Sequence, residues 1–181
     1  MSICKIGKAA PLFELLGVFP DGTFQKVSLQ QNMEQEKWTI LMFYPKDFTK
    51  ICPTEITAMS DRYDEFEELD AVVIGISMDS LGIHEKWIAT PRHLNGVGKL
   101  AFPLATDTYG QLSLKYNVLD EEINLPLRGL FIINPEGELQ YISVLHHNVG
   151  RDVDEILRVL QALQTGGLCP ANWRPGNDLI L

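Results

Sequence analysis

The stretch "WTILMFYPKDFTKICPTEI", residues 38–56, joins a run of bulky apolar residues to the start of an amphipathic helix. The run at 38–44 lies between Lys37 and Pro45, and this pattern is typical of a strand that is buried on both faces. After residue 52, apolar residues recur at helical spacing, and acidic residues occupy the opposite positions. The apolar positions are Ile56, Met59, Tyr63 and Phe66. A buried strand that leads directly into such a helix indicates an α/β sheet.

The residues that follow repeat this alternation of strands and helices. "AVVIGIS" at 71–77 predicts a second buried strand, and residues 80–90 predict a helix that ends before Pro91. A shorter strand near 102–106 and a helix near 109–116 come next. Strand–helix–strand units of this kind imply parallel pairing of the strands.

The later part of the chain adds an antiparallel element. Residues 128–147 predict a hairpin, because two apolar runs are joined by the turn residues at 134–137. A helix is then predicted within 151–167, with Asp152 as its start signal and the paired glycines at 166 and 167 as its stop. The sequence therefore predicts an α/β fold with a mixed central β-sheet flanked by helices.

Composition and charge exclude several classes of protein. The 181 residues are 45% hydrophobic and 22% charged, which fits one globular domain with an ordinary core. A net charge of −9 argues against nucleic acid or an anionic membrane as the main partner. No apolar run approaches the roughly 18 residues that a membrane span requires.

The N-terminal segment and the cysteines bear on the cellular compartment. Pro11 and Glu14 interrupt what would be the apolar part of a signal peptide, so we expect a cytoplasmic protein. Three cysteines are too few for a secreted disulfide framework. The absence of a CxxC motif disfavours a zinc ribbon and a generic disulfide oxidoreductase.

Cys52 occupies a position that suits a reactive thiol. Pro53 favours the first position of a helix, which places Cys52 at or just before a helix N-terminus. Unpaired N–H groups and the helix dipole favour negative charge there, and the thiolate is the nucleophilic form of cysteine. Thr49 offers a hydroxyl that can donate to a sulfur or to a bound oxygen. The alternative is that Cys52 is a small buried apolar residue.

The segment around Cys52 resembles the active site of the typical two-cysteine peroxiredoxins. Its Pro-x-x-x-Thr-x-x-Cys signature is matched by Pro45, Thr49 and Cys52. "TGGLCPANWRPG" at 165–176 is similar to the resolving segment of the family, with Cys169 as the resolving cysteine. "RGLFIINPEG" and "VGRDVDE" carry arginines where the family has a catalytic and a supporting one. These are Arg128 and Arg151.

The resemblance covers nearly the whole chain and implies a fold and a domain organisation. The expected fold is thioredoxin-like. Residues 1–164 are expected to form the peroxidase domain, and residues 165–181 a C-terminal arm that carries the resolving cysteine.

The resemblance also implies a role for each site residue. Pro45 would shield the thiolate of Cys52 from water, and Thr49 would hold a peroxide oxygen together with the amide of Cys52. Arg128 would stabilise the thiolate and the charge that develops on the breaking O–O bond. Glu55 would link Arg128 to Arg151, although a carboxylate in the first turn of a helix is also an ordinary stabilising feature.

The implied activity is the reduction of hydrogen peroxide and organic hydroperoxides. Cys52 would become a sulfenic acid and then form a disulfide with Cys169. Spacing alone leaves open whether one chain or two are joined, and the resemblance implies two. The implied partners are a thioredoxin-like dithiol reductant and a second copy of the chain, in a homodimer that assembles into a ring of dimers. No cofactor and no metal are expected. The rival function is a ring-forming holdase chaperone or redox relay.

A few residues fall outside these motifs. Cys4 is interpreted as an incidental thiol. His146 and His147 are expected to be neighbours on a strand that point to opposite faces, so they would not chelate a metal together. Trp87 is expected in the core or an interface. Lys50 stands where the family usually has a phenylalanine, and its charge would favour the thiolate or weaken packing of the loop.

Overall fold

Two parallel strands form the centre of the sheet. In the computed structural model, which describes residues 4–181, β3 (Trp38–Phe43) pairs with β4 (Ala71–Ser77). Five of the six residues of β3 are buried, which agrees with a sequence that is apolar except at Thr39. The strand predicted at 38–44 and the strand predicted at 71–77 are therefore confirmed.

The remaining strands extend this centre on both sides. Within residues 4–181, seven strands form one sheet in the order β2-β1-β5-β4-β3-β8-β9. β5 (Leu104–Thr106) is parallel to β4, and the hairpin of β8 (Arg128–Ile133) and β9 (Leu139–Leu145) is antiparallel, as predicted. The N-terminal hairpin, β1 (Glu14–Val18) and β2 (Phe24–Ser28), joins the sheet through an antiparallel contact of β1 with β5. The predicted mixed sheet is thus confirmed.

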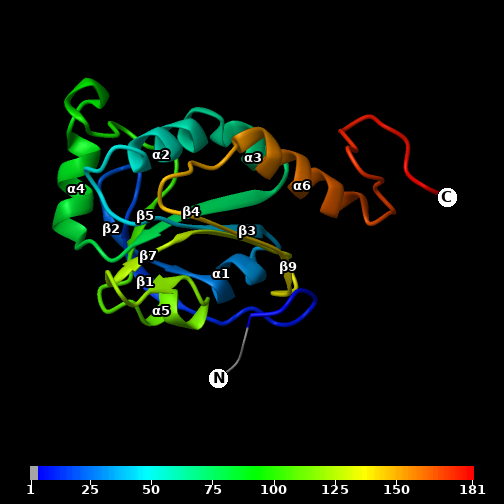
Figure 1. Cartoon of the computed structure of the whole chain (residues 1–181), viewed down its shortest axis with the longest axis horizontal. Helices are drawn as coiled ribbons and strands as arrows, with labels where there is room; N and C mark the ends of the chain where they lie inside the picture. The colour runs from blue at the N-terminus through cyan, green and yellow to red at the C-terminus, as the bar shows by residue number, and fades with distance from the viewer. Residues whose placement is uncertain (1–3) are drawn as a thin grey trace. The chain divides into compact units, whose positions relative to one another are not determined.

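Helices cover both faces of the sheet (Figure 1). α2 (Cys52–Asp61) and α3 (Tyr63–Glu68) lie on one face, and α1 (Leu29–Glu34) and α5 (Gln111–Lys115) lie on the other. α4 (Leu81–Ala89) follows β4, and a short 3₁₀ helix, η1 (Arg92–Leu94), comes after it. The core on the α1 and α5 face includes Leu29, Leu41, Phe43, Ile74, Ile76, Leu112, Tyr116 and Phe131.

The structure differs from the sequence predictions at two places. The apolar pattern after Cys52 predicts one helix, but the backbone leaves helical geometry at Arg62, where φ is −117° and ψ is 19°. Both short helices still bury their apolar residues, since Ile56, Met59 and Phe66 are at most 1% exposed. The sequence also did not predict β1, β2 and α1, nor the small pair of β6 (Leu119–Asp120) and β7 (Leu125–Pro126).

The chain divides into two compact units, Met1–Arg151 and Asp152–Leu181. The second unit begins with α6 (Val153–Thr165), whose N-terminal amides are capped by the carboxylate of Asp152. Gly166 ends the helix in the left-handed conformation, with φ of 66°, as its sequence predicts. The arm that follows is closed by a bridge between Leu168 and Ile180. The functional boundary between residues 164 and 165 stays a prediction.

Among residues 4–181, no helix is both long and apolar enough to span a lipid bilayer.

Candidate active site

Cys52 lies where the loop after β3 enters α2. The helix begins at Cys52 itself and Pro53 is its second residue, one position later than predicted. The Cys52 side chain is completely buried. Amides in the first turn of a helix have no intrahelical acceptor, and together with the helix dipole they favour a negative charge at this position.

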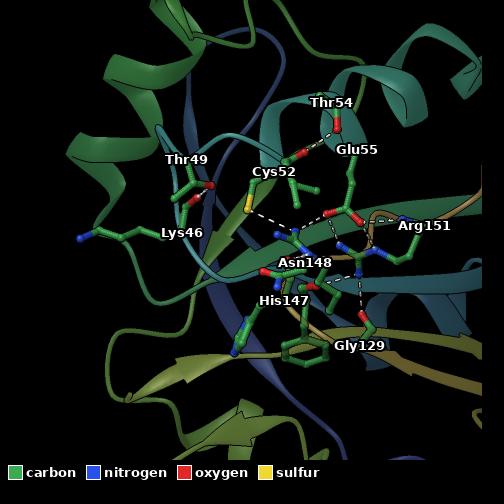
Figure 2. A network of polar contacts seen from close by, with 12 residues as sticks. Lys46, Thr49, Cys52, Thr54, Glu55, Gly129, His147, Asn148 and Arg151 are labelled. Carbon is green, nitrogen blue, oxygen red and sulfur yellow. Dashed lines mark hydrogen bonds and ion pairs between the residues drawn. The ribbon is translucent and has the colours of Figure 1, made fainter. Parts of the chain in front are cut away.

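A buried arginine contacts the sulfur. Nη1 of Arg128, at the start of β8, lies 3.4 Å from Sγ of Cys52 and 2.6 Å from Oε2 of Glu55 (Figure 2). Its Nε donates to the backbone carbonyl of His147 at 2.8 Å. Arg128 is only 3% exposed, so its charge acts in a region that is nearly free of water.

Glu55 joins this arginine to a second one. Arg151 donates to Oε1 of Glu55 from both its backbone amide and its Nε, each at 2.9 Å, and from Nη2 to Oε2 at 3.0 Å (Figure 2). Nη1 of Arg151 also donates to the carbonyls of Phe43 and Gly129, at 2.7 and 2.9 Å. The Glu55 link between the two arginines, predicted from the sequence, is present in the structure.

The charges in this cluster do not cancel. Two guanidinium groups face a single carboxylate, and all three side chains are at most 4% exposed. Buried charges are costly unless they are paired, so one positive charge is left that a thiolate at Cys52 would neutralise. The cluster is therefore chemically suited to stabilise a thiolate nucleophile without a histidine that would act as a general base.

The loop before α2 contains the other predicted residues. Pro45 is buried, Thr49 is half-buried and Lys50 is exposed. The hydroxyl of Thr49 donates to the carbonyl of Lys46 at 2.9 Å (Figure 2). We expected this hydroxyl to be a donor to the sulfur or a ligand, but its proton is already used and its lone pairs remain to accept a hydrogen bond.

The other two cysteines have different surroundings. In the second compact unit, the thiol of Cys169 lies 3.6 Å from the carbonyl of Ala162 and 3.5 Å from the hydroxyl of Thr165. Cys4 lies 3.4 Å from the carbonyl of Lys115, and burial raises the pKa of its thiol. A raised pKa makes Cys4 a poor nucleophile at neutral pH.

The prediction for the two neighbouring histidines was wrong in its geometry. β9 ends at Leu145, so His146 and His147 lie beyond the strand and do not alternate between its faces. Their ring centroids are 6.0 Å apart at 66°. Within residues 4–181, no group of three or more histidine, cysteine or acidic side chains is arranged to hold a metal ion. His147 belongs to the site through its carbonyl, which no sequence signal could reveal.

A second buried polar cluster lies next to this site and was also missed. His84 is completely buried, and its Nδ1 lies 2.7 Å from Oδ2 of Asp47 in the loop before Thr49. Trp87, expected in the core or an interface, is in the core: it is fully buried and its ring packs against Tyr44, with centroids 5.9 Å apart.

Comparisons with known proteins agree on one family. The model of the AhpC/TSA family matches residues 6–142. A Bacillus subtilis protein called "Putative peroxiredoxin YkuU" is 65% identical over 97% of each chain. Among solved structures, the reduced 2-Cys peroxiredoxin of Plasmodium vivax has a TM-score of 0.93 and 38% identity, covering 96% of this chain and 91% of its own. AhpC of Mycobacterium bovis has a TM-score of 0.81 and 36% identity, covering 96% and 100%.

Proposed function

Because the chain belongs to the AhpC/TSA family of peroxiredoxins and is a thiol peroxidase, we propose that Cys52 is the residue that reacts with the peroxide. The contact of Arg128 Nη1 with the sulfur, at 3.4 Å, is the observation that supports this assignment most directly. The substrates are hydrogen peroxide and organic hydroperoxides, and the reaction needs no cofactor.

The first step is a displacement at oxygen. The Cys52 thiolate attacks one oxygen of the hydroperoxide, an S–O bond forms and the O–O bond breaks. The sulfur is oxidised to a sulfenic acid, and the leaving oxygen takes a proton and departs as water or an alcohol. Arg128 stabilises the charge on the leaving oxygen, the hydroxyl of Thr49 accepts a hydrogen bond from the hydroperoxide, and Pro45 excludes water.

The second step returns the sulfur to a form that a reductant can use. The thiol of Cys169 condenses with the sulfenic acid, which forms a disulfide and releases water. The disulfide joins two subunits of a homodimer. A dithiol protein of the thioredoxin type then reduces it by exchange, and both cysteines recover their protons. Two of the similar solved structures, both from Plasmodium species, are themselves named 2-Cys peroxiredoxins, which supports the use of two cysteines.

Single-turnover kinetics test the assignment of Cys52 and Cys169. We expect stoichiometric hydrogen peroxide to oxidise the wild type with loss of two thiols per chain. Cys52→Ser should not react, and Cys169→Ser should lose one thiol and accumulate a sulfenic acid that dimedone traps. Equal reactivity of Cys52→Ser and wild type would refute the role of Cys52. A wild-type disulfide that survives in Cys169→Ser would refute the role of Cys169.

A further inference from the structure

The loop that leads to Cys52 is fastened by a carboxylate that does not touch the sulfur. Oδ1 of Asp47 accepts a hydrogen bond from the hydroxyl of Tyr44 at 2.7 Å, and Oδ2 lies 2.7 Å from Nδ1 of His84. The side chains of Asp47 and His84 are both 0% exposed. Because an unpaired carboxylate is costly to bury, these two partners are what allow Asp47 to point inward.

The position of the proton on His84 follows from its second contact. Nε2 lies 3.3 Å from the carbonyl of Ala105, which can only accept, so Nε2 carries a hydrogen. Nδ1 of His84 and Oδ2 of Asp47 are 2.7 Å apart, within hydrogen-bond distance, and this contact links α4 to the loop.

The backbone of the same loop is held at two more points. The amide of Asp47 donates to Oδ2 of Asp79 at 2.9 Å, and Asp79 is itself held by the hydroxyl of Ser77 at 2.7 Å. The carbonyl of Phe48 accepts from Asn95 Nδ2 at 3.0 Å. These contacts fasten the loop to the end of β4 and to the segment after η1.

The loop needs such support because its backbone is strained. Phe48 has φ of 58°, in the left-handed region that a bulky residue rarely adopts. A conformation of this kind costs on the order of 1–3 kcal/mol and persists only where the surroundings impose it. The strained residue lies between Asp47, which the buried cluster holds, and Thr49.

We propose that Asp47 and His84 are positioning residues for the peroxidase reaction, and that Tyr44 orients Asp47. They set the path of the loop that leads into Cys52 and carries Pro45 and Thr49. Asp47 is two residues from each of them, so a shift of its backbone moves both. This inference rests on the proposed role of Cys52. It gives a function to the buried cluster of Tyr44, Asp47 and His84, which takes no direct part in the reaction.

The test separates positioning from general loss of structure. Asp47→Ala should lower the second-order rate constant for oxidation of Cys52 by hydrogen peroxide by about 10- to 100-fold, because small misplacements of binding groups have effects of this size. Alkylation of Cys52 by iodoacetamide needs no peroxide site and should keep its wild-type rate. Asp47→Asn should recover most of the peroxide rate, since its amide can accept from Tyr44 and donate to Nδ1 of neutral His84.

Two further variants complete the experiment. Tyr44→Phe removes one hydroxyl without changing the shape of the ring, and it should lower the peroxide rate less than Asp47→Ala does. This variant carries the test if Asp47→Ala does not fold. Asp107→Asn is the matched control, because Asp107 is also a buried carboxylate, 3% exposed, but it binds the amides of Leu112 and Ser113 in α5. The control should lower stability and leave the peroxide rate unchanged.

The outcomes distinguish a failure of the positioning role of Asp47 and His84 from a failure of the proposed function of Cys52. Unchanged peroxide rates in Asp47→Ala or, where that variant does not fold, in Tyr44→Phe would overturn the positioning role. Parallel loss of peroxide and iodoacetamide reactivity would also overturn it, since it indicates general damage. Failure of the proposed function looks different: wild-type protein would then show no oxidation of Cys52 by peroxide at all.

Discussion

At the scale of single residues, the site places fixed positive charge, rather than a histidine, beside the sulfur of Cys52. Arg128 serves both the sulfur of Cys52 and the carboxylate of Glu55 through one nitrogen, at 3.4 and 2.6 Å. Arg151 holds Glu55 in place and binds the carbonyls of β3 and β8. A displacement on a peroxide needs a thiolate that already exists. In the proposed mechanism, fixed charge would therefore replace the proton transfer that a histidine performs in other cysteine enzymes.

Replacement of Arg128 tests this use of fixed charge. Arg128→Met should lower the rate of Cys52 oxidation by hydrogen peroxide by about 10²- to 10³-fold, because one charged donor to the developing oxyanion is lost. Arg128→Lys should recover only part, since a lysine cannot hold Glu55 and the carbonyl of His147 at once. Stopped-flow kinetics measure the rate. Arg92→Met, which removes an exposed arginine paired with Asp61, is the control. A wild-type rate in Arg128→Met would contradict the assignment.

The side chains of this site are easier to predict from the sequence than the contacts that hold these side chains in place. Cys52, Glu55, Arg128 and Arg151 belong to motifs and could be named in advance. The carbonyl of His147 could not, because every residue supplies a carbonyl. The pairing of Asp47 with His84 joins residues 37 positions apart, and it depends on how α4 packs beside the loop.

At the scale of elements, burial decides which strands the sequence predicts. β3, β4 and β8 are almost entirely buried, so apolar residues dominate each of them, with a polar or charged residue only at Thr39, Ser77 and Arg128. β2 has three exposed residues of five, and only two are partly or fully buried. Its hydrophobic signal is therefore too short to stand out, although the turn residues Asp21 and Gly22 mark the hairpin.

Gly129 in β8 illustrates how closely the chain segments around the site pack against one another. A Cβ at this position would lie 2.6 Å from Cγ1 of Val118 and 3.1 Å from Cε2 of Phe131. Gly129→Ala should therefore lower the free energy of unfolding by about 1–3 kcal/mol, the usual cost of an overpacked core. Urea denaturation measures the change.

Gly82→Ala is the matched control for this prediction. Gly82 lies inside α4, and a Cβ there would meet nothing within 4 Å. Alanine should stabilise the helix by about 0.5–1 kcal/mol, because glycine has more conformational freedom to lose on folding. If both substitutions changed the stability in the same direction, close packing at Gly129 would not be the cause.

At the scale of the whole molecule, exposed ion pairs make stability depend on pH. Hydrogen bonds from Arg92 hold the pKa of the Asp61 carboxyl below its usual value, and Arg158 does the same for the pKa of Glu155. A carboxyl whose pKa is lower in the folded state adds stability above its unfolded pKa. That stability is lost as the pH falls through the folded value.

Asp61→Asn measures this contribution. Both partners are about half exposed, so the effect should be well under 1 kcal/mol and should weaken with salt. Urea unfolding at about pH 7 should show the variant slightly less stable than wild type. The gap should narrow as the pH falls below about 4, the unperturbed carboxyl value, and close below the lowered pKa of the folded carboxyl. A gap that widens in acid would contradict the assigned direction.

At the same scale, the proposed disulfide requires Cys52 and Cys169 to meet. Cys52 lies in the first compact unit and Cys169 in the second, and their order in the chain does not say which copy supplies each. Co-expression of Cys52→Ser chains with Cys169→Ser chains, distinguished by tags of different size, separates the possibilities. Both chains also carry Cys4→Ser, which removes the half-exposed third thiol.

If the disulfide joins two subunits, peroxide should oxidise Cys52 of one chain, and Cys169 of the other should then displace the hydroxyl of the sulfenic acid. A non-reducing gel should show the mixed dimer and neither homodimer, because each homodimer lacks one of the two cysteines. Reduction should return both monomers. A wild-type protein that loses two thiols per chain yet runs as a monomer, together with no cross-link in the mixture, would place the disulfide within one chain instead.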